Sequence, residues 1–415
     1  MAVMLFIHGG GFVYAAGHLD EETICENFAS RNRVISISGS PFAYWAFNYK
    51  AKNNFKPFAT AAGCWKDGNA TAVVDCLRSK PLLELQTAHF NKFGPDGPLK
   101  RQSKVASYGE GGGHDLFNIM SYRWTPTFDG VVFSKSFEEL AKDGDMPPLI
   151  TGVSNRESFS YAKPWAYRST LWSKKDALQG DMIPSWVDDG QEGKFQSETL
   201  DKELKRAVAA FLDPMEFDPE NRVESSDDVE RIYKVVHHIY HGYKPSKADL
   251  VHNTYQLAGD LWMLVPAIQD AWNRKRNGHQ VWLYNLAFTV QEAAMNLSGI
   301  FRGAVHGDMR AIIFMKTAGG ESVMDHTKAL LKLRAQILDL FTDFAKHGEP
   351  KTIDWPQFES PDKPVNLKFD APEPTVTEQF LEPFVSIWTA VAKREKTGYS
   401  TKFLERRRKR HRDEL

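Results

Sequence analysis

The first residues of this chain that could carry chemistry are glycines that follow an apolar segment. Residues 3–7 read as a short buried strand, and His8-Gly9-Gly10-Gly11 comes directly after them. Because glycine lacks a Cβ, the backbone N–H groups of such a turn can converge on one point. Donors placed in this way stabilise the oxyanion that forms when a carbonyl carbon is attacked. Taken alone, a run of this kind is better explained as a surface turn.

The cysteines favour a disulfide over a metal site. There are three, at 25, 64 and 76, with no CxxC pair and no cysteine–histidine cluster at the spacing of zinc ligands. Cys64 and Cys76 could close a small loop that contains the N-glycosylation pattern at Asn69, and Asn296 begins a second such pattern. These features favour ancestry in the secretory pathway. We predict neither a metal ion nor an organic cofactor.

The elements that must position such residues alternate between strands and helices. Apolar or β-prone runs predict strands at 3–7, 34–37, 147–153 and 279–288. Helical patterns cover about 19–31, 50–62, 70–88, 199–275 with a break near 214–227, and 325–347. We expect Pro266 to kink its helix and Gly348 to end the last one. This order predicts an α/β sheet with a large helical C-terminal region.

Composition excludes several classes of partner. The 415 residues carry a formal net charge of −1, which gives no reason to expect nucleic acid or a membrane surface. Eleven tryptophans in a chain that is 42% hydrophobic are typical of a large globular enzyme. No apolar run approaches the roughly 18 residues of a membrane span.

Read in chain order, a series of segments resembles the type-B carboxylesterase and cholinesterase family. The matching segments are 2–12, 37–47, 62–64, 76–81, 126–130, 152–157, 281–284, 303–308, 355–356 and 365–369. Their sequential order makes the resemblance specific. It implies an α/β-hydrolase fold in one domain over residues 1–400, a small-molecule ester as substrate, and a disulfide between Cys64 and Cys76.

The resemblance also assigns roles to individual residues. Glu157 aligns with the family's catalytic acid and His306 with its general base, in the chain order of α/β-hydrolases. In that mechanism a serine attacks the ester carbonyl, the histidine takes its proton, and the carboxylate orients the imidazole. Gly10 and Gly11 would donate their N–H groups to the oxyanion. Without the matching segments, Glu157 would be read as a surface carboxylate and His306 as a core histidine.

One part of the family pattern is missing. The nucleophile elbow, G-x-S-x-G, should lie between the oxyanion turn and Ser38-Gly39-Ser40, but only residues 13–37 separate the two. The serines at 36, 38 and 40 lack the elbow pattern. We therefore expect a deletion with its seam near Val34–Ile37 and the loss of strands before the oxyanion turn. The resulting central sheet would be incomplete, and its exposed strand edges would favour aggregation.

The tail at 401–415 supports two interpretations. The basic run Arg406–Arg410 could be a nuclear-localisation or anion-binding patch, or a solvated run. Asp413-Glu414-Leu415 resembles a retention signal that a receptor reads in the secretory pathway. With the family resemblance, the tail predicts the endoplasmic reticulum lumen or the secretory pathway. We see no signal peptide, so the chain as given would stay in the cytoplasm.

Three functions fit these observations. The chain could be a carboxylesterase by descent that has lost activity with its serine. It could be an active esterase whose gene model omits an exon, or a non-catalytic interaction protein of the cholinesterase-like kind. We favour the first, the inactive carboxylesterase. The intact Glu157, His306 and glycine turn indicate recent descent from an active enzyme, which argues against the third.

Overall fold

A computed structural model describes part of the chain. The described residues are 33–43, 45–46, 52–66, 69–93, 125–126, 133–142, 144, 146–161, 200–201, 204–205, 207–209, 227–290, 303–316 and 327–395. The oxyanion turn with Gly10 and Gly11, the acceptor Asn296 and the tail at 401–415 lie outside them. The predicted strand at 3–7 and helix at 19–31 also lie outside the described residues.

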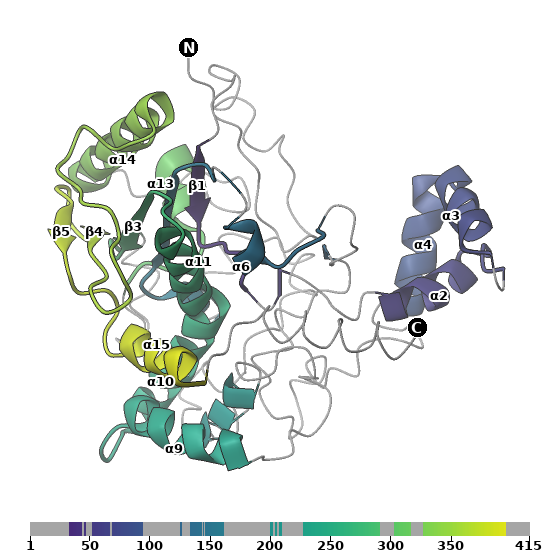
Figure 1. Cartoon of the computed structure of the whole chain (residues 1–415), viewed down its shortest axis with the longest axis horizontal. Coiled ribbons are helices and arrows are strands. Elements are labelled where there is room, and N and C mark those ends of the chain that lie inside the picture. Colours follow the sequence, from purple (N-terminus) through teal and green to yellow (C-terminus); the bar gives the residue numbers. More distant parts are fainter. Residues whose placement is uncertain are drawn as a thin grey trace.

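A five-stranded sheet forms the centre of the fold (Figure 1). Its strands lie side by side in chain order: β1 (Val34–Ile37), β2 (Leu149–Ser154), β3 (Val281–Leu286), β4 (Asn366–Phe369) and β5 (Thr375–Thr377). The first four strands are parallel and β5 is antiparallel to β4. Every residue of β2 and β3 is buried, as expected for parallel strands covered on both faces.

Helices cover both faces of this sheet. In chain order the described helices, not all of which contact the sheet, are α2 (Lys52–Ala61), α3 (Ala70–Ser79), α4 (Leu82–Phe93), α6 (Phe137–Leu140), α9 (Asp227–His241), α10 (Lys247–Gly259), α11 (Val265–Arg276), α13 (Asp308–Phe314), α14 (Lys328–His347) and α15 (Phe384–Glu395). A 3₁₀ turn, η3 (Glu157–Tyr161), follows β2, and a π-helical turn, η7 (Asp260–Leu264), joins α10 to α11. The predicted α/β-hydrolase architecture is confirmed.

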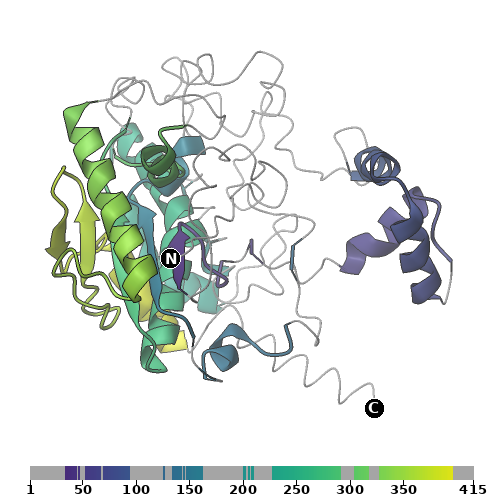
Figure 2. The ribbon, with the colours of Figure 1, turned by 90° about the horizontal axis from the view of Figure 1, so that it is seen from above.

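The two faces of β3 show why the chain forms these layers. Trp282, Tyr284 and Leu286 pack in one core with α13 and α14, the long green helix of Figure 2. Val281 and Leu283, at the alternate positions, pack in another core with η7 and α11. Because strand side chains alternate between faces, one apolar run supplies both cores.

A π-helical turn interrupts the regular helix next to Pro266, the residue at which we expect a kink. α10, η7 and α11 follow one another from Lys247 to Arg276, and the π-helical turn comes directly before the proline. Proline has no N–H to give to the carbonyl of Trp262. The indole Nε1 of Trp45 donates to that oxygen instead, at 2.9 Å, and Ser40 Oγ donates to the carbonyl of Pro266 at 2.8 Å. The segment after β1 thus donates hydrogen bonds to the helix at the point where Pro266 interrupts the helix's own backbone hydrogen bonds.

The helices α2, α3 and α4 form a separate group, which stands apart from the sheet in both views (Figures 1 and 2). A disulfide joins Cys64, which follows α2, to Cys76 in α3. Asn69 is exposed and caps α3, its side-chain oxygen accepting from the N–H of Ala72 at 2.9 Å. The helix expected over 70–88 is interrupted between Ser79, where α3 ends, and Leu82, where α4 begins. In the described part of the chain, no helix has the length and apolarity needed to cross a membrane.

Substitution of Gly152 tests how closely β2 and β3 pack. A Cβ on Gly152 would lie 2.1 Å from the carbonyl oxygen of Tyr284 and 2.5 Å from its ring Cγ. We expect Gly152→Ala to lower the free energy of unfolding by about 2–4 kcal/mol, because the paired backbone cannot move away. Unfolding in urea measures this change. In the control Gly39→Ala, the new Cβ comes no closer than 3.4 Å to Ser36 Oγ. Equal stability of the two variants would contradict the prediction.

Candidate active site

The sequence-predicted acid and base meet at one edge of the sheet. Glu157 begins the turn after β2, and His306 lies in the segment that follows β3. Parallel strands bring their carboxyl ends to the same edge, where α/β folds place their ligand sites. A parallel bridge between Arg156 and Val305 extends the alignment beyond the strands.

The loops that carry the two residues are tied together by backbone bonds. The N–H of Arg156 donates to the carbonyl of Ala304 at 2.9 Å, and the N–H of His306 donates to the carbonyl of Glu157 at 3.2 Å. The side-chain oxygen of Asn155 accepts from the N–H of Ala304 at 2.9 Å. A Cβ at Gly303, whose φ is +128°, would lie 2.6 Å from this same oxygen. Glycine therefore allows the close approach that fixes His306 beside Glu157.

The carboxylate of Glu157 is buried and has a donor at each oxygen. Oε1 accepts from Ser38 Oγ at 2.5 Å and from the backbone N–H of Ser154 at 2.6 Å. Oε2 lies 2.7 Å from Nδ1 of His306. Only 3% of the residue is exposed. An ionised group can be buried at such a position because charge-assisted hydrogen bonds replace its lost hydration.

The imidazole of His306 is oriented by this carboxylate. Burial lowers its pKa, but the hydrogen bond to Glu157 and the charges of Glu157 and Asp308 outweigh burial, so the pKa lies above its ordinary value. The side chain is 37% exposed. With Nδ1 held by Glu157, Nε2 is the atom that can take or give a proton. The pair is therefore arranged as the acid and base of a proton-transfer site.

Ser38 is a site residue that the sequence pattern did not single out. It follows β1, is 4% exposed, and has a φ of +55°, which is unusual for a residue with a side chain. Its N–H donates to the carbonyl of Gly152 at 3.0 Å, and its hydroxyl donates to Glu157. The hydroxyl thus holds the acid and is not bonded to the base. The only available signal was Ser-Gly-Ser at the end of a predicted strand.

A chain of buried hydrogen bonds lies behind the acid. Arg156 Nη1 donates to Gln256 Oε1 at 2.9 Å, and Gln256 Nε2 donates to Asp260 Oδ1 at 2.6 Å. Asp260 Oδ2 accepts from the hydroxyl of Tyr240 at 2.6 Å, and this hydroxyl accepts from Trp388 Nε1 at 2.8 Å. The chain joins the loop after β2 to α9, α10, η7 and α15.

Other predicted positions are not brought to this site. Cys64, Cys76 and Asn69 lie in the separate group of α2, α3 and α4. Gly10, Gly11 and Asn296 fall outside the described residues. Among the described residues, the side-chain hydrogen bond of His306 is the one to Glu157.

Comparisons with known proteins agree with this architecture. A family model described as the carboxylesterase family matches residues 26–388. The chain is 21% identical over 373 residues to gut esterase 1 of Caenorhabditis briggsae, covering 88% of this chain and 58% of the relative. It is 22% identical over 375 residues to gut esterase 1 of Caenorhabditis elegans, with the same two shares. The chain thus spans less than two thirds of the length of these curated relatives.

The pKa of His306 tests the pairing without any assay of activity. We expect the wild-type pKa, read by NMR from the imidazole C2 proton, to lie above 6.5. Because the folded-state pKa is raised, the pairing stabilises the fold fully below pH 6.5, and this contribution is lost as pH rises through the folded-state pKa. Glu157→Gln should lower the pKa of His306. The exposed control Asp354→Asn should not change it, and an equal effect of both variants would refute the pairing.

Asp260 should make stability depend on pH. Burial raises its pKa from 3.8 to about 7, against the hydrogen bonds from Tyr240 and Gln256 and the charge of Arg156. The contribution of protonated Asp260 to the free energy of unfolding is fully present below pH 3.8 and is lost as pH rises to about 7. We expect the free energy of unfolding to fall by on the order of 2 kcal/mol between pH 5 and pH 8 because of this group.

Asp260→Asn should remove that part of the pH dependence, whereas Asp339→Asn on the exposed side of α14 should keep it. Urea unfolding at both pH values measures the difference. If the two variants keep the same pH dependence, Asp260 is not the titrating group.

Proposed function

Because the chain belongs to the carboxylesterase family and is a carboxylic ester hydrolase by descent, we propose that this sequence no longer hydrolyses esters. The observation that carries the proposal is an assembled acid–base pair with no elbow serine to activate. Glu157 and His306 lie 2.7 Å apart, yet the pattern G-x-S-x-G occurs nowhere in the 415 residues.

The position of β1 supports the proposal. Within the described ranges, β1 is the last strand on its side of the sheet. The elbow of an α/β-hydrolase is a sharp strand-to-helix turn that presents its serine at the carboxyl end of the sheet. Ser38, at the end of β1, is buried and already donates to Glu157. A hydroxyl committed to the acid cannot pass its proton to His306.

The cost of losing the nucleophile is large. Removing the serine of a triad lowers kcat by on the order of 10⁶, and the remaining activity comes from the oxyanion hole and binding. Glu157 and His306 can still hold and move a proton at Nε2, but this supplies no acyl-enzyme step.

A second candidate is ester hydrolysis by a longer form of this chain. Two observations favour it: the intact pair of Glu157 and His306, and the 58% share of the relatives' length that the chain covers. In this case the elbow serine would come from residues absent from this sequence, and the substrate would be a small-molecule ester.

The secretory pathway, and the lumen of the endoplasmic reticulum within it, is the location we propose. The disulfide between Cys64 and Cys76 supports it, because such bonds persist in oxidising compartments. The exposed Asn69 of the acceptor tripeptide is a second support. Binding to a retention receptor rests on Asp413-Glu414-Leu415 alone, which lies outside the described residues.

Reaction with a fluorophosphonate tests the loss of activity. We expect the purified chain to show no covalent adduct by intact mass and no hydrolysis of a nitrophenyl ester above background, because the sequence lacks the elbow pattern and no serine of the described residues is bonded to the His306 side chain. An active serine esterase serves as the positive control. Stoichiometric labelling at any serine, or hydrolysis that is lost in His306→Ala, would overturn the proposal. Labelling that is abolished by Ser38→Ala would identify Ser38 as the nucleophile.

A further inference from the structure

A group of side chains on α9 and the helical segment before it takes no part in the acid–base site. Asp201, His237 and His241 come from two segments that pack on each other. The described residues between 200 and 209 are helical, and Leu204 and Val208 share a core with the buried face of α9. This packing fixes Asp201 opposite α9.

The two histidines occupy one face of α9. They are four residues apart in the last turns of the helix, so their side chains project in the same direction. Their rings are stacked, with centroids 4.5 Å apart and an angle of 20° between the planes. Two imidazoles are therefore presented side by side.

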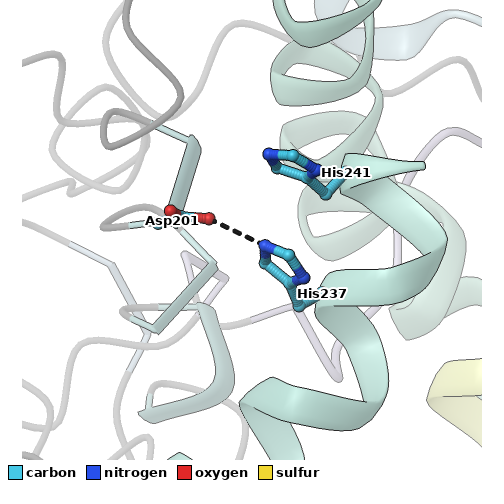
Figure 3. Close-up of side chains that lie close together, drawn as sticks. All are labelled: Asp201, His237 and His241. Atoms are coloured by element: carbon cyan, nitrogen blue, oxygen red, sulfur yellow. Dashed lines mark ion pairs between the residues drawn. The ribbon is translucent and has the colours of Figure 1, made fainter. Parts of the chain in front are cut away.

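Asp201 faces this pair across the gap between the helices (Figure 3). Its Oδ1 lies 3.1 Å from Nε2 of His237. One ligand atom from each of the three residues lies within 4.8 Å of the other two. Oδ1 is buried but accepts no hydrogen bond from the described residues. The side chains of Asp201 and His237 are 32% and 33% exposed, so an ion can reach them from solvent.

The charged and aromatic side chains around Asp201 and His237 have contacts of their own. Lys205 is paired with Glu230 at 2.6 Å. The hydroxyl of Tyr233 forms a side-chain hydrogen bond with Asp201. The ring of Tyr233 lies 5.2 Å from that of His237. These contacts hold Asp201 and His237 in place from outside the group.

We propose that Asp201, His237 and His241 bind a divalent transition-metal ion, for which zinc is the best fit. Two imidazole nitrogens and one carboxylate oxygen are ligands that zinc prefers, whereas calcium and magnesium prefer oxygen ligands alone. Zinc bonds of about 2.0–2.2 Å in a tetrahedral site place neighbouring ligand atoms roughly 3.3 Å apart. The 3.1 Å between Asp201 and His237 already meets this spacing. The ligand atom of His241 lies within 4.8 Å of the other two, so it must move inward to bind, and water would fill the fourth position.

An ion at this place joins the helical segment of residues 200–209 to α9. Because the ligands belong to two elements that separate on unfolding, zinc binds the folded chain in preference to the unfolded one and stabilises it. In the sequence, the site is indicated by the His-x₃-His spacing of His237 and His241 on a predicted helix. The group contains no cysteine, so the cysteine pattern does not reveal it.

Zinc titration of the full chain, prepared without a histidine tag, tests the site. We expect one zinc ion to bind per chain by calorimetry, and cobalt to give the visible absorption of a tetrahedral site. His241→Ala should weaken zinc binding by at least about tenfold, because one of three protein ligands is lost. Asp201→Asn, which keeps the shape of the side chain, should weaken it as well. The matched control is His238→Ala, which removes an exposed neighbour on the same helix.

Thermal unfolding with zinc and with a chelator gives an independent readout. Zinc should raise the Tm of the wild type and of His238→Ala, and should raise that of His241→Ala less. The proposal would be overturned if zinc affinity and the zinc-dependent rise in Tm were the same in the wild type, His238→Ala and His241→Ala. A wild-type chain that binds no zinc would also overturn it.

Discussion

The parallel alignment of β1, β2 and β3 is the constraint on which the rest of the site depends. It brings the carboxyl ends of three strands to one edge, so that Ser38, Glu157 and His306 meet although 119 residues separate the first two and 149 the last two. Gly152 lets β2 and β3 pair closely, since the backbone and ring of Tyr284 fill the space that a Cβ would occupy. Once Glu157 is buried at this edge, each of its oxygens needs a donor, and the three strand ends supply them.

The described core is braced on the side of β1 by contacts between residues far apart in the sequence. The segment after β1 is bonded to the helix around Pro266, where Trp45 replaces the missing backbone donor. The helical side of the core is joined to the loop of Glu157 through Arg156, Gln256 and Asp260. These contacts connect residues more than 200 positions apart in one case and 100 in the other. They show how a sheet whose first described strand is an edge strand can remain ordered.

The sequence predicted those features that depend on local pattern or on the order of family segments. β3 and α14 follow from an apolar run and from a helical repeat that ends at Gly348, whose φ is +80°. Glu157 and His306 followed from the matching segments around them. The role of Ser38 could not be predicted, because it depends on which strand lies beside β2. The π-helical turn before Pro266 likewise depends on a tryptophan that is distant in the sequence.

The burial of Glu157 has a consequence for how such a protein changes over generations. Its carboxylate accepts bonds from Ser38 and Ser154 and contacts His306, so replacing it would leave several buried donors without partners. Purifying selection on folding alone would then preserve the acid after selection on turnover had ceased. An intact acid–base pair can therefore be conserved for its packing as well as for its chemistry.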